Sequence, residues 1–118
     1  MEKAEVKTVT LDVATREEMT RRALAAFRGK KQPARISFAT PELLWRVLTA
    51  KRWELLKMMA GQGAMTIREA ARRVGRDVKA VHADVHALLD AGLLDKTSDG
   101  QIEFRFDAVR VDFTLHAA

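Results

Sequence analysis

Residues 66–92 are predicted to form a pair of short helices joined by a turn that contains a glycine, a pattern that only a few small folds accommodate. Thr66 stands three residues before Glu69, the spacing of a capping box in which each side chain satisfies a backbone donor of the first helical turn. Gly75 supplies the left-handed residue that ends this helix. The apolar residues between these signals recur at helical spacing and predict a face packed on a core: Ile67, Ala70, Ala71 and Val74.

The second helix of the pair is predicted to begin after Asp77, a favoured N-cap residue, and to end at Gly92. Its apolar positions keep helical spacing: Val78, Val81, Val85, Leu88 and Leu89. At about 100° per residue, a second set of side chains lies well away from that stripe: Lys79, His82, Ala83 and His86. Small residues and hydrogen-bonding groups at the start of a helix suit the DNA major groove, so the pair predicts a helix-turn-helix.

A β-hairpin is predicted directly after the second helix, in two extended runs on either side of Ser98, Asp99 and Gly100. Asp-Gly is a strong hairpin signal. Ile102, Phe104 and Phe106 alternate with polar residues, which is the period of a half-buried strand. A helix-turn-helix followed at once by a hairpin predicts a winged helix-turn-helix.

The composition narrows the possible functions. A chain of 118 residues has the length of one domain, and no apolar run reaches the roughly 18 to 20 residues of a membrane span, so we expect a cytoplasmic protein. The absence of cysteine excludes a disulfide scaffold, thiolate zinc sites and cysteine catalysis. We find no glycine-rich phosphate loop, no nucleophile with a base and an acid, and no paired carboxylates. The sequence therefore predicts no enzyme and no cofactor.

Positive charge is concentrated in the helix pair. The net charge is +5, and residues 68–79 hold five cations against two acids. This distribution favours a polyanion as partner, although a merely solvated helix face is the alternative, and Glu69 with Arg73 has the spacing of an ordinary helical ion pair. The predicted DNA-binding residues, which include one on the wing, are Arg68, Arg72, Arg76, Lys79, His82, Ala83, His86 and Lys96.

The whole chain is predicted to be α+β. Residues 1–37 are predicted to form a β-α-β extension, with strands at 6–13 and 34–38 and a helix at 16–28 that a capping box of Thr15 and Glu18 begins. Residues 38–118 are predicted to form the winged helix-turn-helix domain. Its first helices begin at Pro41, after Thr40, and at about Lys51, and a further strand covers 109–115.

The strand at 109–115 has its apolar residues on one face and needs a partner, either elsewhere in the chain or in a second copy. A winged-helix protein of this size normally needs two copies to read enough bases. We therefore expect a homodimer, with the N-terminal unit as the first candidate interface and the strand as the second.

Residues 38–115 resemble a bacterial and archaeal winged helix-turn-helix family of DNA-binding transcriptional regulators. The resemblance rests on PELLWRVLTAKRWELL, on IREAARRVGRDVKAVHADVHALLDAGLL and on the final EF..DAV.VDF. The segment AVHADVHALLDAGLL is also similar to the recognition helix of DeoR-like repressors, with Asp84 in the place of their acidic residue. Members of the first family look like antitoxins encoded beside a small toxin. The resemblance thus implies autorepression and neutralisation of a cognate toxin protein.

Three sets of residues, and the function as a whole, each allow a second interpretation. His82 and His86 could share a metal ion, but Asp84 points elsewhere on the helix and two ligands do not make a zinc site, so we predict no metal. Asp84 is expected to pair with an arginine of the preceding helix, with the reading of a DNA base as the alternative. Trp45 and Trp53 are predicted to lie in the core, with a stacking platform for single-stranded nucleic acid as the alternative. The rival function is a winged-helix module that binds protein without specific DNA binding.

Overall fold

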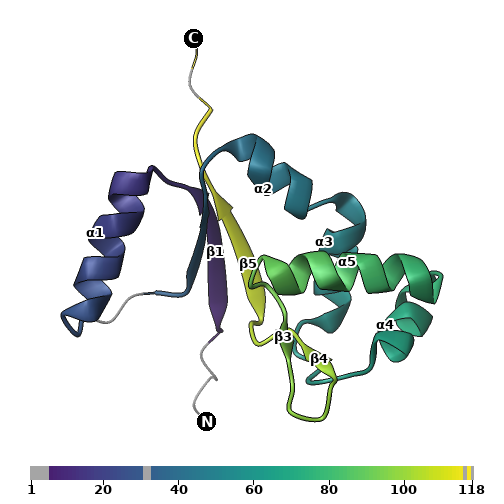
Figure 1. Ribbon diagram of the computed structural model, residues 1–118. Helices are drawn as coiled ribbons and strands as arrows, with labels where there is room; N and C mark the ends of the chain where they lie inside the picture. The colour runs from purple at the N-terminus through teal and green to yellow at the C-terminus, as the bar shows by residue number, and fades with distance from the viewer. Residues whose placement is uncertain (1–5, 31–32, 116, 118) are drawn as a thin grey trace.

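The computed structural model describes residues 6–30, 33–115 and 117, which form an α+β fold as predicted (Figure 1). The helices are α1 (Arg16–Phe27), α2 (Pro41–Val47), α3 (Ala50–Met59), α4 (Ile67–Val74) and α5 (Val78–Asp90). The strands are β1 (Thr8–Val13), β2 (Arg35–Phe38), β3 (Asp95–Lys96), β4 (Ile102–Glu103) and β5 (Ala108–Asp112). Within the described ranges, no helix combines the length and the apolar character that crossing a membrane requires.

Three strands form a parallel sheet in the order β2-β1-β5. Leu11 of the central strand lies opposite Ile36 on one side and Val111 on the other. The C-terminal strand β5 therefore pairs within the chain, and β1 and β2 of the predicted extension share one sheet with this strand of the predicted second domain. In Figure 1, α1 lies on one side of this sheet and α2 to α5 lie on the other.

The core sits between the sheet and the helices α2 to α5. Because side chains alternate along a strand, Val9 and Leu11 of β1 point into it. Leu44 of α2, Leu55 of α3 and Leu88 of α5 meet them there, and all five side chains are buried. The sheet thus covers the apolar face that these helices share and packs against the inner side of the helix pair.

Helix α1 is held to the sheet by polar contacts. It has no buried residue, and Phe27 at its end is 90% exposed. Arg22 donates a hydrogen bond of 2.8 Å to Ser37 Oγ and lies 3.5 Å from the buried carboxylate of Asp12, which also accepts from Ser37 at 2.6 Å and from Arg35. Burial alone would raise the pKa of Asp12, but the hydrogen bonds from Ser37 and Arg35 and the charge of Arg22 lower it below its usual value.

The prediction that both tryptophans lie in the core is wrong. Trp45 is 54% exposed and Trp53 is 41% exposed. In α3 the face toward the core is filled by Leu55, Leu56 and Met59, and Trp53 lies at the margin of that face. Val78, the first apolar position predicted on the inner face of the second helix of the pair, is also exposed.

Candidate nucleic-acid interface

The boundaries of α4 and α5 follow the predicted capping signals. The Thr66 hydroxyl accepts a hydrogen bond of 3.0 Å from the amide of Glu69. Gly75 adopts the left-handed conformation, with φ of 67°, at the end of α4. The Asp77 carboxylate then accepts a hydrogen bond of 3.1 Å from the amide of Lys79 and begins α5. The two helices are thereby separated by a short, well-defined turn.

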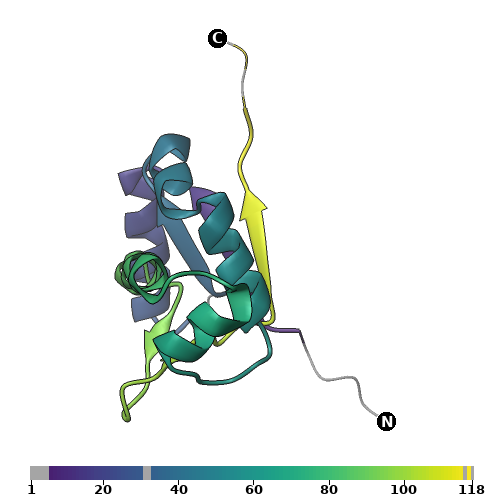
Figure 2. The same cartoon turned by 90° about the vertical axis from the view of Figure 1, so that its right-hand side faces the viewer.

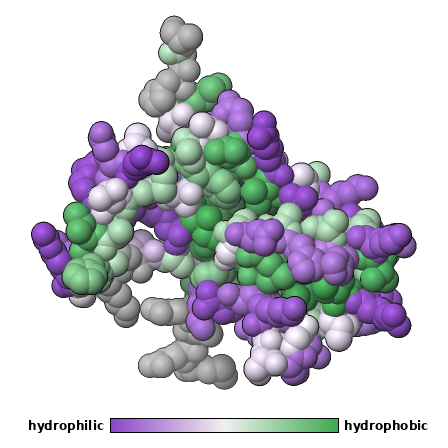
Figure 3. Space-filling model, in the orientation of Figure 1, coloured by the Kyte–Doolittle hydropathy of each residue, from purple (hydrophilic) through white to green (hydrophobic). Residues whose placement is uncertain are grey.

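The outward face of α5 gathers the side chains that the helical spacing placed there. Lys79, His82, Ala83 and His86 are all exposed. The two histidine rings lie side by side, with their Nε2 atoms 3.1 Å apart. Among the residues described, no group of three or more His, Cys, Asp or Glu side chains is arranged to hold a metal ion. In Figure 3 hydrophilic residues cover most of the α5 side of the molecule.

The basic side chains of α4 differ in how they are held. Arg68 is exposed, and none of the ion pairs within the described ranges involves it. Arg72, 72% exposed, donates two hydrogen bonds of 2.7 and 2.6 Å to the Glu69 carboxylate, and Arg73 donates one of 2.8 Å. These hydrogen bonds lower the pKa of Glu69 from 4.5 to about 2.

The Glu69 carboxylate therefore binds two arginines. The expected capping box is only half formed, since Thr66 caps the helix but the hydrogen bonds of the Glu69 side chain go to Arg72 and Arg73. The guanidinium groups carry a full positive charge and the backbone amide does not, so they attract the carboxylate more strongly, which explains the difference. The expected pairing of Glu69 with Arg73 is confirmed.

Asp84, on the inner side of α5, binds two arginines from elsewhere in the chain. Arg76, in the turn, donates to Asp84 Oδ2 at 2.7 Å, and Arg52 of α3 donates to Oδ1 at 3.0 Å. Arg52 also donates to the carbonyl oxygens of Arg46 and Val47, both at 3.0 Å. Burial alone would raise the pKa of Asp84, but the hydrogen bonds from Arg76 and Arg52 lower it overall.

This cluster, Arg52–Asp84–Arg76, ties α3, the turn and α5 together and so fixes how the outer face of α5 is presented. The expected pairing of Asp84 with an arginine is confirmed, but the arginine does not belong to the preceding helix: Arg76 lies in the turn that follows α4. The second partner, Arg52, had no local signal because 32 residues separate it from Asp84. Arg76, predicted to contact DNA, is turned toward Asp84 and largely buried. Its Nη1 atom has no hydrogen-bond partner in the part of the chain that the structure describes.

The hairpin after α5 is shorter than its alternating pattern suggested. Each strand has two residues, with Asp95 opposite Glu103 and Lys96 opposite Ile102. Ile102 also exchanges two backbone hydrogen bonds, of 2.8 and 2.9 Å, with Met65, which anchors the hairpin to the segment before α4. Beyond Glu103 the chain leaves the hairpin to reach β5. Lys96 is exposed on the hairpin.

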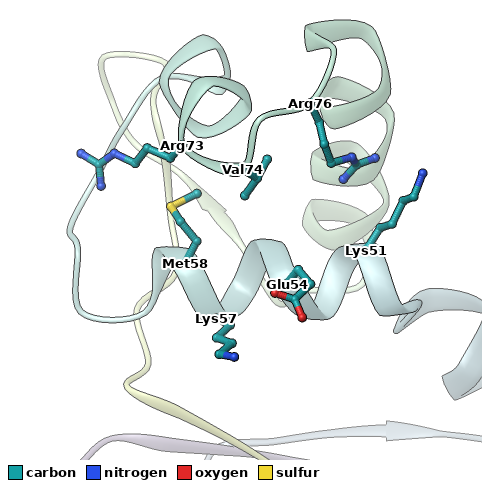
Figure 4. A pocket seen from close by; sticks show the side chains of 7 residues that line it. All are labelled: Lys51, Glu54, Lys57, Met58, Arg73, Val74 and Arg76. Atoms are coloured by element: carbon teal, nitrogen blue, oxygen red, sulfur yellow. The ribbon is translucent and has the colours of Figure 1, made fainter.

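A basic cleft of about 560 Å³ lies between α3 and the α4–α5 turn (Figure 4). Lys51 and Lys57 line it from α3, and Arg73 and Arg76 line it from α4 and the turn, with Glu54 as the acidic residue of the lining. Lys51 and Arg76 lie at the same end of the cleft in Figure 4. The positive charge of the helix pair thus continues onto α3, which the sequence did not indicate because the cleft arises only when α3 packs on α4.

The family model HVO_A0114 matches residues 47–111, which include α3, α4, α5, the hairpin and most of β5. The match covers 65 of the 118 residues (111 − 47 + 1), more than half of the chain. Comparisons with curated proteins and with solved structures give no match. The segment that carries the capped helix pair and its basic face therefore places the chain in the HVO_A0114 family.

Proposed function

We propose that this protein is a sequence-specific, double-stranded DNA-binding transcriptional regulator with a winged helix-turn-helix fold. In this proposal α3, α4 and α5 are the three core helices, the β3–β4 hairpin is the wing, and α5 enters the major groove. The observation that carries the proposal is the exposed face of α5, which presents Lys79, His82 and Ala83 from its first turns. The major groove is about 12 Å wide and admits a helix, whose N-terminal side chains reach base edges.

The surrounding charges support the same placement. Arg68, on the exposed side of α4, and Lys96, on the hairpin, are suited to contact phosphates on either side of α5. The partly buried Arg52–Asp84–Arg76 cluster holds the helix in place, so Arg76 serves the interface by positioning α5. Base contacts by α5 would specify the sequence, while the arginines and lysines would supply affinity that depends on salt.

Alanine substitutions test the two kinds of contact separately. Using a duplex selected from a random pool, we expect Lys79→Ala and His82→Ala each to weaken binding by about 1 to 3 kcal/mol, or about 5- to 150-fold, if a base edge is contacted. Arg68→Ala should weaken binding to all duplexes alike and reduce the salt slope by about one unit. Fluorescence anisotropy at several salt concentrations measures both effects.

The control is Arg21→Ala, an exposed arginine on α1, which lies on the opposite side of the sheet. Its affinity for the duplex should match that of the wild type. Affinity that does not change between low and high salt would contradict the proposal. Failure of any duplex to be enriched would favour the rival function, a winged-helix module that binds protein.

Glu69→Gln should strengthen non-specific DNA binding. The substitution removes the carboxylate that holds Arg72 and Arg73 and raises the net charge from +5 to +6. Two arginines released next to α5 can contact phosphates, so the salt slope should steepen by about one to two units. Glu17→Gln, on the exposed first turn of α1, makes the same charge change as a control. Equal effects of the two substitutions would show that Glu69 does not restrain the arginines of the interface.

One copy of α5 reads few base pairs, so the proposal includes a homodimer on a two-fold symmetric operator. Half-sites should be separated by about 34 Å, one turn of DNA, or a multiple of it. Autorepression and neutralisation of a cognate toxin are further predictions, and they rest on the family resemblance.

A further inference from the structure

Strand β5 lies at an edge of the parallel sheet and has one side unpaired. Its neighbour on the other side is β1, and within the described part of the chain no strand pairs with its free side. In Figure 2, β5 (yellow) runs along one edge of the fold, with the helices to its left. An edge strand presents backbone N–H and C=O groups that can pair with another chain. β5 has no proline to prevent this pairing.

The two faces of β5 differ in chemistry. On the face away from α2 to α5, Arg110 and Asp112 are 68% and 56% exposed. They stand two residues apart, carry opposite charges and form an exposed ion pair of 3.7 Å with each other. On the other face, Val109, Val111 and Phe113 pack against the edge of the core and remain partly exposed. The free edge therefore has a charged side and an apolar side.

Partly exposed aromatic residues line the apolar side. The ring of Trp45 lies edge-on to Phe113, with centroids 5.8 Å apart. Trp53, Leu56 and Val109 line a cavity of about 480 Å³ beside the start of β5. Both tryptophans, which the sequence had placed in the core, thus lie beside the free edge of the sheet. A second layer of apolar side chains would bury them.

We propose that a second copy of this chain pairs with the free edge of β5, antiparallel and with the two-fold axis at Val111. This register sets Arg110 opposite Asp112 of the partner subunit, and the symmetry makes the pair twice. A shift of two residues in one direction would set Arg110 opposite Arg110 of the partner subunit. A shift of two residues in the other direction would set Asp112 opposite Asp112 of the partner subunit. Opposite charges across an antiparallel pair stabilise it and like charges destabilise it, so the charges select one register.

The same register completes the apolar side. Val109 lies opposite Phe113 of the partner subunit, which brings that ring toward the cavity beside Trp53. The two three-stranded sheets become one sheet of six strands, and the unpaired backbone groups of both edges find partners. The surface is separate from the outer face of α5, so this inference does not depend on DNA binding.

Charge reversal tests the surface and its register together. The full-length chain should sediment as a dimer, and Arg110→Asp or Asp112→Arg alone should weaken the dimer by about tenfold or more, because each turns both attractive pairs into repulsive ones. Mixing the two variants should restore association as a heterodimer. One chain then carries two acids and the other two arginines, and every pair is again opposite in charge.

Sedimentation equilibrium measures the dissociation constants, and circular dichroism checks that each variant keeps the fold. Arg21→Asp, an exposed reversal on α1, serves as the control and should leave the dimer unchanged. A chain that stays monomeric at every concentration, or a dimer that both reversals leave intact, would overturn the proposed surface. Weakened variants that fail to associate on mixing would overturn the register.

Discussion

Replacing Asp84 with alanine should lower the free energy of unfolding by about 3 kcal/mol. The carboxylate accepts hydrogen bonds from Arg52 at 3.0 Å and from Arg76 at 2.7 Å, and all three side chains are largely buried. Without Asp84, two guanidinium groups remain in the protein interior with no counter-charge, which costs far more than the ion pair itself contributes. Urea denaturation followed by circular dichroism measures the loss.

The matched control is Asp90→Ala, which removes the same group from an exposed position at the end of the same helix. Its effect should stay within about 0.5 kcal/mol. Equal effects of the two substitutions would show that the Arg52–Asp84–Arg76 cluster does not stabilise the fold. We also expect Asp84→Ala to weaken DNA binding more than its stability loss explains, because the cluster orients α5.

The contribution of Asp84 should depend on pH in a defined direction. The hydrogen bonds from Arg76 and Arg52 lower the pKa of Asp84 in the folded protein below its ordinary value of 3.8. The stabilisation is therefore fully present above about pH 4 and is lost as the pH falls through the lower, folded-state pKa. The difference in stability between the wild type and Asp84→Ala should shrink below about pH 4. A difference that stays constant down to acid pH would contradict the assigned pairing.

Leu11→Ala should destabilise the protein by about 2 to 5 kcal/mol. Leu11 is fully buried on the central strand, between β2 and β5, and faces the core formed by α2 to α5. Its truncation removes apolar contacts and leaves a cavity between the sheet and the helices. Thermal or urea unfolding measures the effect, and a single cooperative transition should persist because the sheet and helices share one core.

Leu24→Ala makes the same truncation on α1, where the side chain is half exposed, and should cost much less. If Leu11→Ala had no larger effect than Leu24→Ala, β1 would not belong to the shared core. For the same reason, deletion of residues 1–36 should expose the apolar face of the helices and leave β5 without its neighbour.

The helix pair could be predicted from the sequence because its signals are local. Thr66, Gly75 and Asp77 act on backbone groups within a few residues of themselves, and each occupies the capping position expected of it. The outward face of α5 followed from helical spacing in the same way. Glu69 was misjudged because Arg72 and Arg73, which are as close to it as the cap, compete for its carboxylate.

The longer-range contacts had no such signals. Asp84 and Arg52 are 32 residues apart, and β1 and β5 are about 100 residues apart, so no spacing along the chain relates them. Trp45 and Trp53 are exposed because the core covers only one side of the short helices α2 and α3 that carry them. Lys96 and Arg68 were predicted as DNA-binding residues from their charge and the elements that carry them, but their arrangement around α5 depends on how the hairpin and α4 pack.

The helices, their N-cap residues, the hairpin turn and the outward face of α5 could be predicted from the sequence, since hydrogen bonding and side-chain periodicity act within one or two turns of the chain. Which helices and strands far apart in the sequence contact each other followed only from the folded structure. It set β1 between β2 and β5, turned Arg76 inward toward Asp84 and left one edge of β5 free. The strand order and the orientation of Arg76 arise because the chain must bury its apolar surface without leaving charges unpaired in the interior. All elements must satisfy this condition together, so it cannot be evaluated from one segment alone.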